Sequence, residues 1–471
     1  MLRARQPARP APSGAREEAV IEILTIETPE LGDRSYLVHD GAVALVVDPQ
    51  RDIDRVLALA SEAGVRIEAI AETHMHNDYV TGGLALAAET GARYLVNAAD
   101  PVSFEREEVR DGDRIDLGSF TVEVLATPGH TPNHLSYLVY EGDRPTSVFT
   151  GGSLLFGTVG RTDLISAEQT EPLTRAQYRS AHRLAELPGS VEVLPTHGFG
   201  SFCSSASTSG SSASTIDQER RQNLALTLTD EDTFVKTLLS GLTAYPRYYA
   251  YMGERNLAGP GPVRYDPPAP VDPEELGRRI EAGEWVVDLR DRRAYAKGHL
   301  SGTVGIELGD LFSTYHGWVV PWGEPVTLIG ERPEDVERAQ RDLSRIGIDE
   351  LAGAAVGPVE HLAGARPLSS YEVTDFAGLA SRLAAGERWT ILDVRRDDER
   401  EVAHIEHSVH IPLQDLQARL GEVPDGPVAV HCAAGFRASI GASLLDGAGK
   451  QLVLVDDDFS RAADAGLPVV S

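Results

Sequence analysis

The chain has 471 residues, of which 42% are hydrophobic and 24% are charged, and its formal net charge is -29. This apolar content is too high for a disordered chain, because such chains cannot bury enough apolar surface to fold. The negative charge excludes nucleic acid and anionic membrane surfaces as expected partners, since phosphate binding requires basic patches. No run approaches the roughly 18 apolar residues that span a bilayer.

The N-terminal part predicts a leader followed by a layered α/β region. Residues 1–19 are rich in Arg, Pro and Ala but lack the apolar core of a secretory signal, which predicts a disordered leader. Residues 20–245 mix short apolar strands such as AVALVVDP with helical patterns such as DIDRVLALASEAG. Polar residues gather at the strand ends, which is typical of an α/β domain with its site at one edge of the sheet.

The C-terminal half contains an internal repeat. A Pro-rich linker is predicted over residues 246–272, and two similar segments follow at 273–365 and 366–471. EWVVDLRDRRAYAKGHL in the first resembles RWTILDVRRDDEREVAHI in the second, which predicts two copies of one small α/β domain. Gly330 in the first copy stands where Cys432 stands in the second.

Four histidines and one aspartate predict a metal site. His74, His76 and Asp78 lie in ETHMHNDYVTGG after a predicted strand, His130 lies in TPGHT, and His197 lies in LPTHGFG. Histidines two residues apart in extended backbone point the same way. Each of the motifs lies at a strand end beside Gly, Pro or Thr. Imidazoles grouped in this way can bind Zn²⁺ or Fe²⁺.

Cys432 has the surroundings of a reactive thiol. VHCAAGFRAS places it between a strand and a helix, where backbone N–H groups and the helix N-terminus stabilise a thiolate. Arg437 adds a cation, and Cys-x4-Arg predicts a small anion cradle that suits a terminal sulfur. The remaining cysteine, Cys203, is distant in sequence, so no disulfide framework is expected and a cytoplasmic location follows.

These motifs resemble a known family. Thr-His-x-His-x-Asp, then Pro-Gly-His-Thr, then Thr-Gly and Gly-Arg-Thr-Asp-Leu at 160–164, then a last His, resemble the metallo-β-lactamase fold and its persulfide dioxygenase branch, close to glyoxalase II. The two repeats resemble rhodanese domains. The chain after the leader therefore resembles bacterial persulfide dioxygenase–sulfurtransferase fusions, in which an inactive rhodanese lies between a metallo-β-lactamase domain and an active rhodanese.

The resemblance implies the fold and the roles of both cysteines. It implies an α/β multidomain chain, with an N-terminal metallo-β-lactamase αββα sandwich over 20–245 followed by two rhodanese-like α/β domains. The first of these, 273–365, would be degenerate, and the second would carry a persulfide on Cys432. Cys203 resembles a cysteine in the same loop of the fusion enzymes, where a persulfide could pass near the metal; a free thiol in a flexible loop is the alternative.

Two departures from the family pattern concern the metal. Tyr79 stands where the family's second metal site begins with a His, which leaves a mononuclear site. The family's carboxylate ligand comes from Thr-Gly-Asp, but this chain has Gly152 in place of the Asp. We therefore expect one Fe(II) per chain, with Zn(II) as the alternative, held without the anionic ligand.

The expected function is sulfane-sulfur metabolism. A low-molecular-weight thiol persulfide would be oxidised at the metal centre, coupled to sulfur transfer at Cys432 with thiosulfate or sulfite as a further partner. Three alternatives are a rhodanese-type sulfurtransferase with a silent metallo-β-lactamase domain, a zinc-dependent thioester hydrolase like glyoxalase II, and a non-enzymatic persulfide-binding scaffold. The sequence is compatible with a homo-oligomer and leaves the physiological thiol open.

Overall fold

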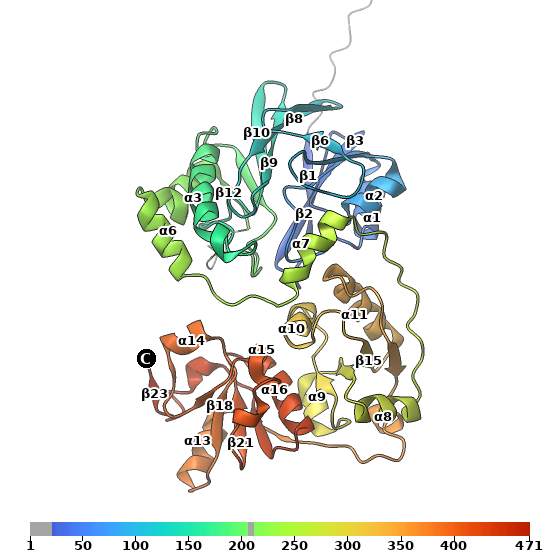
Figure 1. Ribbon diagram of the computed structural model, residues 1–471, viewed down its shortest axis with the longest axis vertical. Helices are drawn as coiled ribbons and strands as arrows, with labels where there is room; N and C mark the ends of the chain where they lie inside the picture. Colours follow the sequence, from blue (N-terminus) through green and yellow to red (C-terminus); the bar gives the residue numbers. More distant parts are fainter. Residues whose placement is uncertain (1–20, 206–211) are drawn as a thin grey trace, which may run out of the picture.

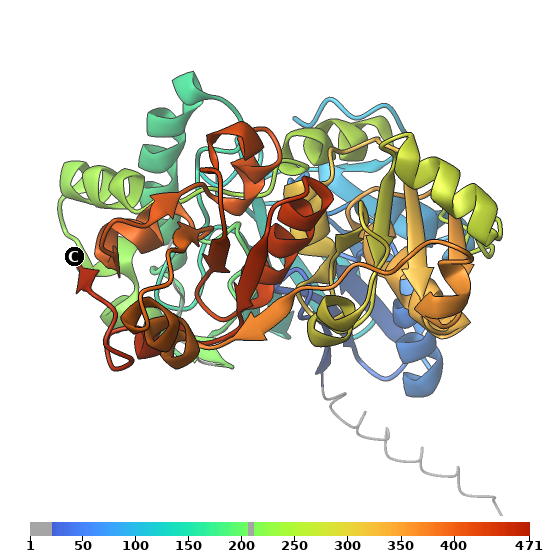
Figure 2. The same ribbon diagram turned by 90° about the horizontal axis from the view of Figure 1, so that it is seen from below.

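The computed structural model describes residues 21–205 and 212–471. The leader predicted over 1–19 lies outside them. In the view of Figure 1, the described residues up to Ala258 form the upper lobe, and two smaller α/β units lie below it. Figure 2 shows these two units side by side beneath the N-terminal lobe.

The N-terminal lobe is built on β-sheets that pack face to face. One sheet has the spatial order β1 (Glu22–Thr28), β2 (Asp33–His39), β3 (Val43–Val47), β4 (Arg66–Ala71), β5 (Arg93–Asn97) and β6 (Glu107–Val109). The other has the order β12 (Ser214–Thr215), β11 (Glu192–Pro195), β10 (Arg144–Gly151), β9 (Leu135–Glu141), β8 (Phe120–Ala126) and β7 (Arg114–Leu117).

Apolar residues on alternate positions fill the space between the sheets. On β8, Phe120, Val122 and Val124 are buried in this core, whereas Thr121 and Glu123 face outward and are half-buried. Side chains of a strand alternate between its faces, so this period of two aligns the apolar residues with the opposite sheet. The core cluster also takes residues from β2, β3 and β4 of the other sheet.

Helices cover the outer face of each sheet and complete four layers. Val56 and Ala60 of α1 (Asp54–Ala63) and Leu86 of α2 (Gly83–Thr90) are buried against the first sheet. Leu184 of α3 (Ala167–Leu184) and Phe234 of α6 (Glu231–Ser240) are buried against the second. Helices α4 (Ile216–Gln222) and α5 (Leu224–Thr227) come between α3 and α6 in the sequence. The predicted αββα sandwich is thereby confirmed.

The segment predicted as a linker over 246–272 is partly helical. It contains α7 (Tyr249–Ala258), and extended backbone without regular structure follows the helix until α8 begins. Tyr249, Met252 and Asn256 are buried along the helix, so it packs into the fold instead of spanning solvent. The prediction was wrong for these residues because the prolines that indicated a linker all come after Ala258 or before Tyr249.

The two C-terminal units have parallel sheets with the same strand order. The first unit contains α8 (Pro273–Glu281), β13 (Trp285–Asp288), α9 (Arg292–Lys297), β14 (Val304–Gly305), α10 (Phe312–Val319), β15 (Val326–Gly330), α11 (Pro333–Arg345), β16 (Gly353–Val356) and α12 (Val359–Leu362). The second contains β17 (Glu372–Thr374), α13 (Phe376–Ala384), β18 (Thr390–Asp393), α14 (Asp397–Val402), β20 (Val409–His410), α15 (Leu413–Leu416), β21 (Val428–His431), α16 (Phe436–Gly447) and β22 (Leu452–Val455), with β19 (His404–Ile405) paired to β23 (Val469–Val470). The sheets run β14-β13-β15-β16 and β20-β18-β21-β22-β17.

The strand register supports the internal repeat. Asp288 pairs with the residue before Gly330, and Asp393 pairs with the residue before Cys432. Gly330 and Cys432 therefore occupy equivalent positions at the ends of the central strands. We refer to residues 273–365 as the Cys-less unit from here on.

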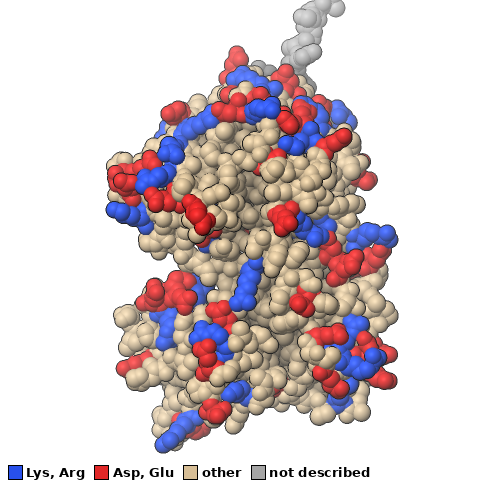
Figure 3. Space-filling view, viewed as in Figure 1, with Lys and Arg blue, Asp and Glu red and all other residues tan. Residues whose placement is uncertain are grey.

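In the described residues, no helix combines the length and the apolar character needed to cross a membrane. On the face shown in Figure 3, Lys and Arg are interspersed with Asp and Glu.

Candidate metal centre and Cys432 loop

The predicted ligands come from the ends of strands in both sheets of the N-terminal lobe. His74 follows β4, His130 follows β8 and His197 follows β11. Asp48 follows β3 in the same way, and Gly152 directly follows β10. Strand ends that meet at one edge of a sandwich bring residues distant in sequence together.

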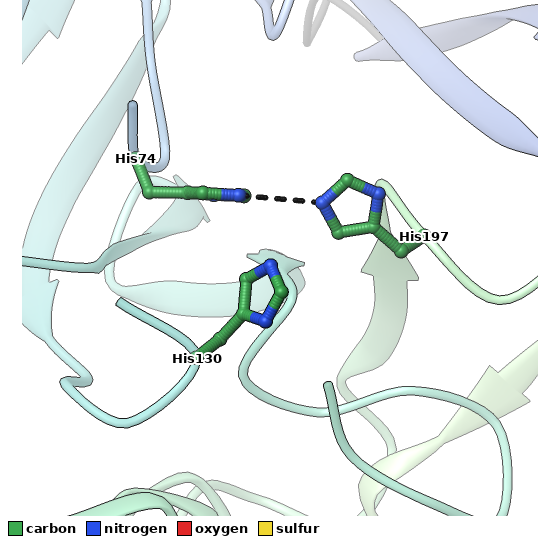
Figure 4. Close-up of side chains that lie close together, drawn as sticks. All are labelled: His74, His130 and His197. Carbon is green, nitrogen blue, oxygen red and sulfur yellow. Dashed lines mark hydrogen bonds between the residues drawn. The ribbon is translucent and has the colours of Figure 1, made fainter. Parts of the chain in front are cut away.

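Three imidazoles converge at this edge (Figure 4). The ring centroids of His74 and His130 are 4.8 Å apart, those of His74 and His197 are 5.3 Å apart, and those of His130 and His197 are 5.2 Å apart. Their exposed fractions are 2%, 0% and 0%. The Nε2 atoms of His74 and His197 face one another at 3.3 Å.

Hydrogen bonds at Nδ1 turn the Nε2 atoms of two of these rings inward. His130 Nδ1 donates to the carbonyl of Arg161 at 2.7 Å, and His74 Nδ1 lies 2.9 Å from Thr73 Oγ1. The Thr73 hydroxyl donates its proton to Asp48, so it must accept from His74 Nδ1–H. Both rings therefore carry lone pairs on Nε2. Burial lowers the pKa of His130 to about 3 and lowers that of His74 well below its usual value, which keeps both neutral.

His197 is oriented by two carboxylates. Its Nδ1 lies 2.8 Å from Asp33 Oδ1 and 3.1 Å from Asp78 Oδ2. Burial would lower the pKa of His197, but the negative charges of Asp78 and Asp33 outweigh it and raise the pKa. Its Nε2 proton then donates to His74 Nε2, and a metal ion at this point would replace that proton. A carboxylate behind a ligating histidine is a common way to fix its tautomer and orientation.

Asp48 ties the loops of two of the histidines together. Its Oδ1 accepts the backbone N–H of Thr73 at 2.7 Å, and its Oδ2 accepts the hydroxyls of Thr73 and Thr196. These threonines immediately precede His74 and His197. One buried carboxylate thus sets the distance between two predicted ligands.

His76 lies beside these rings, with its centroid 4.1 Å from that of His74, but its Nε2 has other partners. Its Nε2 is 2.9 Å from the Tyr79 hydroxyl, 3.3 Å from Asp48 Oδ1 and 3.4 Å from Glu72 Oε2. Burial opposes protonation, but the charge of Asp48 dominates and raises the pKa of His76 to about 9. As an imidazolium this ring neutralises buried acids. The structure thus brings together His74, His130 and His197, and it also brings His76 and Asp78 together with His197 as a second possible ligand group. In this structure, however, the His76 and Asp78 side chains are paired with other residues.

The converging group fits a bound metal ion. His130 Nε2 is fully buried and has no hydrogen-bond partner, and such an orphaned acceptor requires an explanation. It belongs to a group whose ligand atoms, from His74, His130 and His197, all lie within 4.8 Å of one another. Three imidazoles with open positions can hold Zn²⁺ or Fe²⁺, once His197 has given up its Nε2 proton.

Gly152 lies directly against this group. A Cβ at Gly152 would overlap the His130 imidazole, so glycine lets that ring pack on the backbone. Its N–H donates to His134 Nε2 at 3.0 Å. The left-handed backbone lies at Gly151, with φ 51°, and not at Gly152. A side chain at 152 is therefore limited by His130 and not by backbone conformation.

Two substitutions at this position separate a ligand effect from a steric one. Gly152→Asp and Gly152→Ala both add a Cβ that requires His130 to move, but only Asp adds an anionic oxygen beside the imidazoles. We expect the Asp variant to bind Fe²⁺ about tenfold or more tighter than the Ala variant, a difference of about 1.4 kcal/mol. Anaerobic Fe²⁺ titration, with thermal melting of both variants, measures it. Equal affinities would show that position 152 is not a vacant ligand position.

Cys432 lies in a tight loop between β21 and α16. It is 2% exposed, and the loop ends at Gly435, whose φ of 87° is left-handed. A side chain at Gly435 would also overlap Asp456, so both conformation and space require glycine there. The loop delivers the thiol to the N-terminus of a 12-residue helix.

Arg437 is paired within the protein. Its Nη1 and Nη2 donate to the carboxylate of Glu399 at 2.5 and 2.7 Å. Arg437 therefore does not supply a free positive charge to the predicted anion cradle, because Glu399 compensates the charge of its guanidinium. Of the features predicted around Cys432, the position before the N-terminus of α16 is the one that the structure retains.

Cys203 is packed in the interior. It is 0% exposed, and its carbonyl accepts the N–H of Arg161 at 2.8 Å. Burial, assisted by the charge of Asp78, raises the pKa of the Cys203 thiol well above its usual value. Cys203 is therefore a protonated, buried thiol, and not an exposed one in a flexible loop.

Helix α10 of the Cys-less unit lies between the two centres. Its Trp318 ring is 5.5 Å from that of Phe202, next to Cys203. Its Tyr315 ring is 5.4 Å from that of Phe436, which opens the helix after the Cys432 loop. Both cysteines belong to one continuous buried apolar cluster.

Several residues in these sites could not be recognised from sequence motifs. Asp33 and Glu399 carry no recognisable motif, because their partners lie far away in the chain. Asp48 could have been recognised from the sequence. It directly follows the buried strand in VVDP, just as His74 comes shortly after the end of another buried strand. Glu72 stands two residues before His74 and was not distinguished from an ordinary strand-end residue.

Two family models match the chain. That of the metallo-beta-lactamase superfamily matches residues 30–197, and that of the rhodanese-like domain matches residues 377–464. The former range holds the three converging histidines, and the latter holds Cys432.

Individual proteins are similar over longer stretches. The mitochondrial persulfide dioxygenase ETHE1 of Bos taurus is 30% identical over 211 residues, which cover 44% of this chain and 74% of the bovine protein. Its Homo sapiens counterpart is 29% identical over 242 residues, covering 51% of this chain and 80% of the human protein. A solved metallo-beta-lactamase structure from Staphylococcus aureus has a TM-score of 0.65 and 27% identity, and covers 72% of this chain and 99% of its own.

Proposed function

Because the chain belongs to the persulfide dioxygenase–rhodanese fusions of the metallo-β-lactamase superfamily, we propose that it processes the sulfane sulfur of a low-molecular-weight thiol persulfide at two centres. The observation that carries the proposal is the buried convergence of His74, His130 and His197. Cys432, at the N-terminus of α16, supplies the second centre.

At the first centre, the persulfide is oxidised to sulfite and thiol. The balance is RSSH + O₂ + H₂O giving RSH + SO₃²⁻ + 2 H⁺, with the outer sulfur oxidised and O₂ reduced. A bound ferrous ion would supply a coordination position for sulfur and the electrons that O₂ activation requires. His74 and His130 are neutral ligands, and Gly152 supplies no carboxylate. A bound persulfide anion would therefore supply the negative charge at this site.

At the second centre, Cys432 carries sulfur. Its thiolate attacks the outer sulfur of a persulfide, which breaks the donor S–S bond, forms a new one at Sγ and releases the donor thiolate. Sulfite attack on that outer sulfur then yields thiosulfate and returns the Cys432 thiolate. The product of the first centre is thus an acceptor for the second.

The runner-up is a sulfurtransferase whose metallo-β-lactamase domain is catalytically silent. Gly152 favours it, because the site lacks the carboxylate of the two-His, one-carboxylate arrangement that suits ferrous iron. Zinc-dependent thioester hydrolysis ranks lower because Tyr79 stands where the second metal site of the family has a His, and its hydroxyl bonds to His76.

Two assays separate these functions. We expect the anaerobically iron-loaded protein to consume O₂ and form sulfite with glutathione persulfide, and to form thiocyanate from thiosulfate and cyanide. Thiocyanate formation without O₂ uptake would support the sulfurtransferase whose metallo-β-lactamase domain is catalytically silent. Hydrolysis of a glutathione thioester by the zinc-loaded protein, without O₂ uptake by the iron-loaded one, would favour the hydrolase. Binding of the persulfide without either activity would identify a scaffold.

A further inference from the structure

The loop that carries the predicted ligands is held by a residue outside the metallo-β-lactamase match. Asn256 on α7 is 0% exposed. Its Nδ2 donates to the carbonyls of His76 and Tyr79 at 2.8 and 2.9 Å, and its Oδ1 accepts the N–H of Thr81 at 3.0 Å. A single side chain therefore satisfies three backbone groups of a buried loop that has no regular secondary structure of its own.

The Cys-less unit holds the same loop from another side. The N–H of Val80 donates to the carbonyl of Arg345, the last residue of α11, at 2.7 Å. The Arg345 guanidinium, 5% exposed, donates to Asp52 of the N-terminal lobe at 2.8 Å and to Asp342 at 3.0 Å. These ion pairs fix the end of α11 against the lobe, so the carbonyl that receives Val80 is itself fixed.

We propose that Asn256 and Arg345 form a clamp that positions the metal-ligand loop, and that holding this loop is the function of α7 and the Cys-less unit. The inference rests on the proposed metal centre. Backbone groups of residues 76, 79 and 81 are hydrogen-bonded to the Asn256 side chain, and that of residue 80 is hydrogen-bonded to the Arg345 carbonyl. In Figure 1, α7 lies at the lower edge of the upper lobe, above α10 and α11.

The clamp explains why a unit without a thiol remains packed on the metal domain. Buried backbone groups need partners, and the loop after β4 cannot find them in a strand or a helix. If the clamp loosens, the loop loses its fixed path and His74 its fixed distance to His130 and His197. Residues that orient metal ligands without touching the metal typically contribute about 10- to 100-fold to metal affinity.

The test replaces Asn256 by its isostere. Asn256→Asp keeps the volume and the acceptor for Thr81 but cannot donate to the two carbonyls. Asn223 offers a matched control, because it is equally buried and its Nδ2 donates to the carbonyls of Leu155 and Thr158 at 2.9 and 2.7 Å, away from the ligand loop. The probe is Co²⁺ alone, whose visible absorption reports coordination geometry, added to the full-length metal-free chain.

We expect Asn256→Asp to weaken Co²⁺ binding by about 10- to 100-fold and to change the absorption spectrum. Asn223→Asp should lower the melting temperature at least as much, because Asn223 also bonds to Glu219, yet keep the affinity and spectrum of the unmodified chain. Unchanged Co²⁺ binding in Asn256→Asp would overturn the clamp alone. Absence of Co²⁺ binding by the unmodified chain would overturn the metal centre and the clamp together.

A second pair of variants tests the Cys-less unit and does not depend on Asn256. Arg345→Met removes the buried bonds to Asp52 and Asp342, whereas Arg341→Met removes a more exposed ion pair of the same interface, to Asp54. Weaker Co²⁺ binding in Arg345→Met only would support the clamp. Equal affinities in the two variants would overturn the part played by α11.

Discussion

Replacement of Cys432 by Ser is expected to abolish sulfur transfer, lowering thiocyanate formation from thiosulfate and cyanide by about 10³-fold or more. A serine hydroxyl cannot form a persulfide, and it is not ionised at neutral pH even at a helix N-terminus. The rest of the loop should persist, because its turn depends on Gly435. Stopped assays of thiocyanate with both proteins measure the effect.

The control for this variant is Gly330→Ala at the equivalent strand end of the Cys-less unit. Its new Cβ would lie 3.1 Å from a side-chain methyl of Val336, which small adjustments can relieve. We expect it to retain full sulfur transfer. Activity in Cys432→Ser, or its loss in a well-folded Gly330→Ala, would show that the reactive thiol has been assigned to the wrong position.

Replacement of His130 by Ala is expected to remove bound metal. His130 Nε2 is a buried lone pair with no protein partner, and without it only two of the converging imidazoles remain. The loss of affinity should exceed the about 10- to 100-fold typical of residues that only orient ligands. Competition with a chelator under anaerobic conditions measures the affinity.

His134 supplies a matched control within the same cluster. Its ring lies 4.9 Å from that of His74, but its Nε2 accepts the N–H of Gly152 and its Nδ1 bonds to Thr127. Both nitrogens are thus engaged, and His134→Gln should keep the metal content of the unmodified chain. If His134→Gln lost metal and His130→Ala kept it, the ligand set would have to be redrawn.

Sequence patterns predicted the elements that depend on local order. His74, His130 and His197 were recognisable because each follows an apolar strand, and strands of a sandwich end at shared edges. The equivalence of Gly330 and Cys432 was also predictable, since the repeat carries the same Asp-x-Arg step. Arg290 binds Asp288 at 2.7 Å, and the second copy has the same ion pair.

Roles that depend on distant partners were not predictable. Asp78 is a predicted ligand, yet it lies on the Nδ1 side of His197, where Asp33 of β2 also lies. His76 is also a predicted ligand, yet its Nε2 faces the carboxylates of Asp48 and Glu72. Asn256 was hidden in a segment whose prolines indicated a linker. In each case at least one deciding contact joins residues that are distant in the chain, such as Asp33 with His197 or Asp48 with His76.

Metal analysis of the anaerobically purified, unmodified chain decides whether the three buried imidazoles hold one metal ion. We expect about one iron or zinc ion per chain, held by His74, His130 and His197. His76 could form a second ligand group with Asp78 and His197, but its Nε2 is paired with Asp48, Glu72 and the Tyr79 hydroxyl. A chain that contains no metal and takes up none on titration with Fe²⁺ or Zn²⁺, or one that holds two tightly bound ions, would contradict this account.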